Sequence, residues 1–305
     1  MAASRTGSRR TGDKRAGSGR HVAGTVRVGT SGWHYKHWLG TWYPSGTKAT
    51  DQFAYYRERF DTVEINNSFY KLPSRETFAA WREAAPAGFL YSVKASRYIT
   101  HMRKLMEPEQ SFDKFWTQVA VLKDKLGPIL FQLPPLWKIN TARLSAFLDA
   151  LPPGHRYVFE FRNPTWYHDE VYALLSAHDC AFCIYELAGH LSPPQVTSSF
   201  VYVRLHGPGA KYSGSYTDAQ LQSWTDRSME HAREGRDVFV YFDNDELGHA
   251  AFNAQRMREL VAQAQQASGT AVARNEGVSR RTTRSPKPTQ AAPKVRAQPI
   301  RRQMP

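Results

Sequence analysis

Cysteine is scarce in this sequence, and long apolar runs are missing from it. Only two cysteines, Cys180 and Cys183, occur among 305 residues. They stand three apart in an expected strand, so their side chains should point to opposite faces, which suits neither a shared metal nor a redox disulfide. We expect both to be small buried residues. No run approaches the roughly 18 apolar residues of a membrane helix, so we expect no membrane partner.

Targeting and dinucleotide-binding signals are also missing. Arg9–Arg10 is not followed by the apolar stretch that a twin-arginine signal needs, and we recognise no signal peptide. The expected location is therefore the cytoplasm. After the first expected strand, "GTSGW" does not match the pattern G-x-G-x-x-G. This disfavours an open doubly wound sheet, and no cofactor is predicted.

Acidic residues are outnumbered, and the basic excess lies at the two ends of the chain. The formal net charge is +14, of which residues 1–24 carry +5 and residues 266–305 carry +8. Both ends are rich in Arg, Ser, Gly, Pro and Ala, so we expect disordered basic tails on either side of one domain, residues 25–265. The tails either keep the protein soluble or bind nucleic acid weakly, in a salt-dependent way.

Eight short β-like runs alternate with helical stretches in the central part of the chain. We expect strands at residues 26–30, 62–66, 89–95, 128–133, 156–162, 180–186, 200–206 and 237–243. The sixth connection, residues 187–199, contains Pro193–Pro194 and is expected to be an irregular loop rather than a helix. Eight strands alternating with helices over about 240 residues are typical of a single (β/α)8 TIM-type barrel.

Polar side chains gather where these expected strands end. In "YVFEFR", residues 157–162, Glu160 and Arg162 share one face of the strand and Phe161 takes the other. Helices cover the outside of a barrel, so the two charges should point into its mouth, where catalytic groups of such barrels lie. The other strands place polar groups at the same end, namely Glu64, Asn66, Lys94, Gln132, Arg204, His206 and Asp243.

These groups form either a ligand site or a salt-bridged plug that merely closes the barrel. Buried ion networks stabilise a fold poorly, because desolvation offsets most of the attraction, and this favours a site. Aromatic rings in the adjoining loops suit the stacking of sugars or nucleobases, and the candidates are Trp33, Tyr70 and Trp166. Asn244 follows the last strand and is a candidate binding residue, although it or Asp245 equally suits a helix cap.

Seven ordered motifs give the chain a family resemblance. At the expected strand ends stand "VGTSGWHY", "VEINNSFY", "FLYSVKA", "LFQLPP", "FEFRNPTW", "VYVRLHG" and "YFDND" with "GHAAFNA". Together they resemble the YecE-like family, also called domain of unknown function 72. The resemblance implies a TIM-type barrel in a bacterial or archaeal cytoplasmic protein. It implies no reaction, because none is assigned to that family.

The first functional hypothesis is an enzyme, of hydrolase or lyase type, for an anionic, ring-bearing substrate such as a phosphorylated sugar or a nucleotide fragment. In it, Lys94, Arg162 and Arg204 hold the anion. Glu64 or Glu160 acts as general base, and His206 as acid or base. Its candidate catalytic residues are Glu64, Glu160, His206 and Asp243, and its candidate binding residues include Gln132, Asn66 and the aromatic side chains named above.

Two further hypotheses belong to other classes. One is metal-dependent phosphodiester cleavage of nucleic acid, with a divalent metal held by Glu64, Glu160, His206 and Asp243. The interleaved cations Lys94, Arg162 and Arg204 argue against it, because they would do electrostatically what a metal does. The other is a non-enzymatic module that binds a ligand or RNA.

Overall fold

The computed structural model describes residues 22–282, with side chains described as far as residue 268. The chain divides into two compact units after Ala262. Residues 1–21 and 283–305 lie outside the described residues, and with them most of both predicted tails. None of the helices in the described range is long and apolar enough to cross a membrane.

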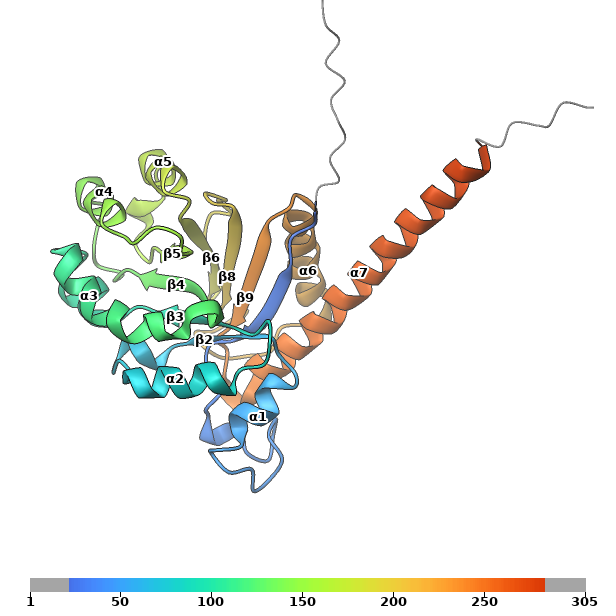
Figure 1. Cartoon of the computed structure of the whole chain (residues 1–305), viewed down its shortest axis with the longest axis horizontal. Coiled ribbons are helices and arrows are strands. Elements are labelled where there is room, and N and C mark those ends of the chain that lie inside the picture. Colours follow the sequence, from blue (N-terminus) through green and yellow to red (C-terminus); the bar gives the residue numbers. More distant parts are fainter. Residues whose placement is uncertain (1–21, 283–305) are drawn as a thin grey trace, which may run out of the picture. The chain divides into compact units, whose positions relative to one another are not determined.

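A nearly closed barrel of eight parallel strands forms the core of the first unit (Figure 1). Its hydrogen-bonded order is β1-β9-β8-β6-β5-β4-β3-β2. The eight strands that the sequence predicts are confirmed, and the fold is a TIM-type barrel. Their bounds are β1 (Val26–Thr30), β2 (Thr62–Ile65), β3 (Leu90–Lys94), β4 (Leu126–Gln132), β5 (Tyr157–Glu160), β6 (Ala181–Leu187), β8 (Phe200–Leu205) and β9 (Asp237–Phe242).

The barrel closes between β1 and β2 without a regular ladder. A Cβ atom on Gly29 would lie 2.4 Å from the carbonyl oxygen of Thr62, so only glycine lets the two strands approach this closely. The hydroxyl of Tyr56 accepts a hydrogen bond from the backbone N–H of Thr30 at 3.0 Å and donates one to the Thr62 carbonyl at 3.1 Å. A side chain thus links the two strands where backbone pairing is missing.

Helices follow the strands, and those within the first unit cover the outside of the barrel. They are α1 (Gln52–Arg57), α2 (Arg75–Ala84), α3 (Pro108–Val119), α4 (Thr141–Asp149), α5 (Asp169–Ala177), α6 (Asp218–Arg233) and α7 (His249–Thr282). Local sequence explains several starts: the Ser74 side chain caps α2, and Thr217 with Gln220 forms a capping box on α6.

The sixth connection is irregular, as predicted. It contains no helix between β6 and β8, but it does contain a two-residue strand, β7 (His190–Leu191), which pairs antiparallel with β6. This strand is not predictable from the sequence, because two residues carry no periodicity. The predicted burial of Cys180 and Cys183 as free cysteines is confirmed.

The last helix continues past residue 265, after which a disordered tail is expected from the sequence. The α7 backbone is helical as far as Thr282. Residues 261–267, "VAQAQQA", are mostly Ala and Gln, which favour a helix, and the basic composition that suggests disorder is concentrated further on. The predicted boundary therefore falls inside a helix.

Candidate functional site

Arg204 lies at the centre of the predicted charge cluster. It is fully buried and projects from β8 into the barrel. Its Nε and Nη2 donate to the two carboxylate oxygens of Glu64 at 3.0 and 2.7 Å. Its Nη1 donates to Glu160 at 2.8 Å, and Nη2 also reaches Asp243 at 3.0 Å. One guanidinium therefore holds three carboxylates, from β2, from β5 and from the residue after β9.

Glu64 has every acceptor position filled. Besides the fork from Arg204, its Oε1 accepts from the Ser31 hydroxyl at 2.6 Å and its Oε2 accepts from the Tyr202 hydroxyl at 2.6 Å. The side chain is fully buried. A carboxylate held in this way is a fixed anion and is poorly placed to take a proton from a substrate.

Arg162 joins the cluster from the other side. Its Nε donates to Glu160, and its Nη2 lies 2.9 Å from Nε2 of His206. Because a guanidinium only donates, Nε2 must carry the imidazole lone pair and Nδ1 the proton. Nδ1 lies 2.9 Å from Oδ2 of Asp243, but the ring N–H is not aligned with that oxygen and makes no hydrogen bond within the described residues. The contact with Arg162 alone sets the neutral tautomer of His206.

The proton affinities follow from these contacts. Burial, followed by the charge of Arg204, lowers the pKa of His206 to about 4, against the opposing effect of Asp243. Burial alone would raise the pKa of Glu160, but Arg162 and Arg204 outweigh it and hold that pKa well below its usual range. Near neutral pH, His206 is therefore uncharged and Glu160 is ionised.

Lys94 is the exception in the cluster. It ends β3, its side chain is almost buried, and its Nζ lies 4.5 Å from the centre of the Phe69 ring. Within the described residues it makes no hydrogen bond and no ion pair through Nζ. Burial, followed by the charge of Arg204, lowers its pKa to about 8, although three carboxylates oppose the shift. Lys94 can therefore exchange a proton close to neutral pH.

The cluster has a buried layer and a layer that reaches solvent. Glu64, Glu160, Arg204 and His206 are fully buried. Lys94 and Asp243 each retain 7% exposure. Nη1 of Arg162 has no hydrogen-bond partner in the part of the chain that the structure describes. The layer that reaches solvent therefore presents two cationic donor atoms without a hydrogen-bond partner among the described residues, Nζ of Lys94 and Nη1 of Arg162, and the carboxylate of Asp243.

Three other predicted residues have no hydrogen bond with the cluster among the described residues, although Gln132 pairs with Glu160 in the register of β4 and β5. Trp166 is fully buried, stacks on Phe161 and donates from Nε1 to the carbonyl of Trp137, so the interpretation as a substrate wall is corrected to packing outside the barrel. Gln132 ends β4, partly exposed, and its side chain has no hydrogen bond in the described part of the chain. Asn244 is buried, and its Nδ2 donates to Gly214 and Asn253 rather than capping a helix.

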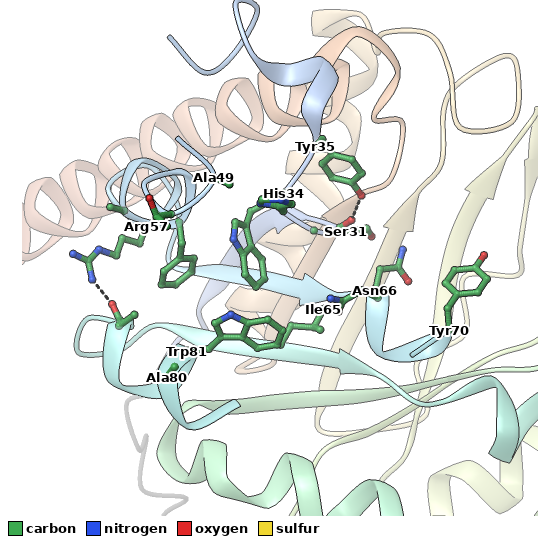
Figure 2. Close-up of a pocket in the computed structure, with 17 residues that line it drawn as sticks. Ser31, His34, Tyr35, Ala49, Arg57, Ile65, Asn66, Tyr70, Ala80 and Trp81 are labelled. Atoms are coloured by element: carbon green, nitrogen blue, oxygen red, sulfur yellow. Dashed lines mark hydrogen bonds between the residues drawn. The ribbon is translucent and has the colours of Figure 1, made fainter. Parts of the chain in front are cut away.

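The remaining three predicted residues surround a cleft beside the mouth. Trp33, Asn66 and Tyr70 line a cavity of about 920 Å³ that also involves α1 and α2 (Figure 2). Trp33 is 9% exposed and Tyr70 is 77% exposed. The cleft adjoins the cluster through Ser31, which lines it and also bonds to Glu64.

Three further side chains, beyond those predicted from the sequence, contact the cluster. Tyr202 stands two residues before Arg204 on β8, so strand alternation alone indicates that it faces the same interior. Ser31 directly follows β1 and fits the rule used for the other strands. Tyr185 lies with its ring 4.6 Å from the guanidinium of Arg162. Only the three-dimensional structure reveals this last contact.

The acidic residues do not form a metal site. Within residues 22–268, no three His, Cys, Asp or Glu side chains are grouped so that they could hold a metal ion. Arg204 lies among Glu64, Glu160 and Asp243, where a bound metal would have to lie. The donor set therefore suits an internal guanidinium better than a divalent cation.

Comparisons with known proteins agree with the fold and the motifs. Residues 27–276 match the family described as "Protein of unknown function DUF72". The chain is 26% identical to the UPF0759 protein YunF of Bacillus subtilis over 273 residues, which is 77% of this chain and 94% of that protein. It is 27% identical to the UPF0759 protein YecE of Escherichia coli over 47% of this chain and 50% of that protein.

Solved structures give the same result. A crystal structure of a DUF72 family protein from Thermotoga maritima superposes with a TM-score of 0.72 at 26% identity, covering 78% of this chain and 99% of that one. A DUF72 family protein from Enterococcus faecalis superposes with a TM-score of 0.67 at 20% identity, covering 78% and 96%. The barrel, the ordered motifs and these matches together show that the chain belongs to the DUF72 family.

Proposed function

We propose that this protein is an enzyme acting at the C-terminal mouth of its barrel on a small, anionic, ring-bearing molecule, such as a phosphorylated sugar or a nucleotide fragment. One observation carries the proposal. Nζ of Lys94 and Nη1 of Arg162 are cationic donors without a hydrogen-bond partner among the described residues, and both belong to the layer that reaches solvent. Such donors favour a carboxylate or phosphate oxygen.

The roles of the residues differ from those expected from sequence. Arg204 is occupied by three carboxylates, so the anion is assigned to Lys94 and Arg162 alone. Glu64 and Glu160 are bound by arginine and are poor general bases. Lys94, with a pKa of about 8, is the group best suited to exchange a proton near neutral pH. A proton transfer by Lys94 is compatible with a hydrolase or a lyase.

Native mass spectrometry of the protein taken directly from expressing cells tests the proposal. The wild type should retain a small anion, and Lys94→Met should lose it. Lys138→Met, at an exposed lysine in the loop after β4, is the matched control and should retain it. Turnover of phosphorylated sugars and nucleotides should likewise fall with Lys94→Met only. Equal retention and turnover in both variants would contradict the proposal.

A non-enzymatic binding module is the second candidate. The observation in its favour is that arginine engages both glutamates: Glu64 has all its acceptor positions filled, and Glu160 is held by Arg204 and Arg162, which makes both poor general bases. Ligand retention that depends on Lys94, with no turnover of any retained molecule, would support this candidate over the enzyme.

Cytoplasmic location and weak nucleic-acid binding by the tails are further parts of the proposal. They rest on the sequence alone: no signal peptide is recognisable, and residues 1–24 and 266–305 carry +5 and +8. Deleting both segments should abolish salt-dependent RNA retention and leave binding at the barrel mouth unchanged.

A further inference from the structure

The cleft beside the barrel mouth is open because small residues face it. Ala54 of α1 and Ala80 and Ala84 of α2 line it. Positions 80 and 84 are one helical turn apart, so the two alanines present a shallow strip on one side of α2. Larger side chains there would fill the gap between the helices. Its volume of about 920 Å³ is within the usual range for small-molecule sites.

Aromatic rings form the inner wall of the cleft. Trp33, from the loop after β1, lies 5.2 Å from Trp81 of α2 and 5.3 Å from Phe53 of α1, measured between ring centres. Figure 2 shows Trp81 in the lining of the cleft, with Arg57 on the side away from Tyr70. Arg57 donates to the carbonyl of Ala84 and so joins the two helices. The rigid walls suit a flat ring.

Asn66 supplies an unused polar group on the side toward the barrel mouth. Its Oδ1 is buried and has no hydrogen-bond partner among the described residues. A buried acceptor without a donor is costly, which indicates that a ligand donor completes it. In the register of β2 and β3, Ile65 pairs with Val93, so Asn66 and Lys94 occupy neighbouring positions one residue further on.

The charge of the lining narrows the ligand class. No Asp or Glu lines the cleft, and Arg57 is its one Lys or Arg residue, within the described part of the chain. A cationic ring would meet no compensating carboxylate there. A neutral planar ring meets aromatic faces on one side and a carboxamide at its edge.

We propose that this cleft binds the neutral planar ring of a small molecule, with the ring against Trp33 and Trp81 and a ring N–H or O–H donated to Asn66. The site stands on these contacts alone. That the ring belongs to the same molecule whose anionic group reaches Lys94 rests on the proposed function. In that case the two sites together select a heterocycle, such as a nucleobase, joined to a phosphate or carboxylate.

Matched probes test the ring site without an anion. Indole and benzofuran have nearly the same shape, but only indole carries an N–H donor. Calorimetry or ligand-detected NMR on the full chain should show indole binding about three- to tenfold more tightly than benzofuran, which corresponds to one hydrogen bond. Asn66→Leu should remove this difference.

Filling the cleft gives the second arm of the test. Ala80→Leu, at an exposed position of α2, should weaken binding of both probes at least tenfold without disturbing the fold. Ala142→Leu, at an exposed position of α4, is the matched control and should leave binding unchanged. Equal affinity for the two probes, or binding insensitive to Ala80→Leu, would overturn the inference.

The two proposals fail separately. Indole binding should be unaffected by Lys94→Met, while binding of inorganic phosphate should be lost in that variant and kept in Ala80→Leu. Suppose that Lys94→Met leaves phosphate binding unchanged, while Ala80→Leu weakens indole binding and Asn66→Leu removes the preference for indole. The proposed function is then contradicted, and the ring site is supported. Association of the wild type into dimers that Ala80→Leu disrupts, without probe binding, would show that the cleft holds a second copy and would also overturn the inference.

Discussion

Arg204 and Glu64 form a two-point fork inside the barrel, with Nε and Nη2 of the arginine 3.0 and 2.7 Å from the two carboxylate oxygens. The residues belong to β8 and β2, which are not neighbours in the sheet. The fork therefore connects distant strands across the interior. It also explains why Arg204 is unavailable to a ligand, since its remaining nitrogen binds Glu160.

Removing this guanidinium should destabilise the fold strongly. Arg204→Met leaves Glu64, Glu160 and Asp243 buried without their shared partner, and we expect a loss of about 3–5 kcal/mol in the free energy of unfolding. Urea denaturation followed by circular dichroism measures it. Arg82→Met removes an exposed ion pair with Asp124 and should change the stability by less than about 1 kcal/mol. Similar losses in the two variants would show that the network is not the source of stability.

The pH dependence of stability should report His206. The unfolded chain takes up the proton near pH 6.5, whereas burial and Arg204 lower the pKa of folded His206 to about 4. The unfolded state therefore binds more protons in this window, and stability falls as the pH drops from 6.5 to 4. Between pH 7 and pH 5 the loss is about 2 kcal/mol.

One variant distinguishes the contribution of His206 to the pH dependence of stability from that of the carboxylates. His206→Gln should flatten the stability curve between pH 7 and pH 5, as measured by urea denaturation at each pH. Glu160, whose folded pKa is depressed by Arg162 and Arg204 against the effect of burial, stabilises the fold above its ordinary pKa. That contribution is lost only at lower pH and should remain in the variant. An unchanged slope from pH 7 to 5 would contradict the assignment.

Lys94 should lower stability while serving function. Burial and Arg204 lower its pKa from 10.5 to about 8, so folding is increasingly disfavoured as the pH falls from 10.5 to 8, and by a constant amount below that. Lys94→Met should therefore stabilise the protein at pH 7 by about 3 kcal/mol. The gain, read from denaturant midpoints, should shrink toward pH 10. Destabilisation at pH 7 would show that the amine has a structural partner.

Strand alternation made much of the fold and of the cluster predictable. The pattern Glu160–Phe161–Arg162 indicates which side chains enter the barrel, and Phe161 does pack outside it, against Trp166. Strand alternation does not indicate which of these side chains form hydrogen bonds or ion pairs with one another. That Arg204 would bind three carboxylates while Lys94 stayed unpaired depends on strand tilt and side-chain length, which no local pattern encodes.

The cleft could not be predicted from the sequence, for a different physical reason. Trp33 and Asn66 are recognisable at strand ends, but Trp81 and Ala80 belong to α2 and look like ordinary helix residues. A cavity arises from the volume that Ala54, Ala80 and Ala84 leave unfilled, and an amphipathic pattern gives no measure of that volume. Trp166 shows that loop position can also mislead. It lies in a loop at the end of the barrel where ligands bind, yet it is fully buried and cannot contact a ligand.

Closure of the barrel should depend on Gly29. A methyl group at this position would lie 2.4 Å from the carbonyl oxygen of Thr62, so Gly29→Ala must push β1 and β2 apart. We expect a loss of about 2–4 kcal/mol, because the contacts of Tyr56 with both strands are disturbed as well. Thermal and urea denaturation measure it, and amide exchange should show faster exchange at Thr30, whose N–H binds Tyr56. Gly209→Ala is the matched control, since a Cβ there meets nothing within 4 Å and no positive φ is required. If both variants are equally stable, the close approach at Gly29 does not hold the barrel closed.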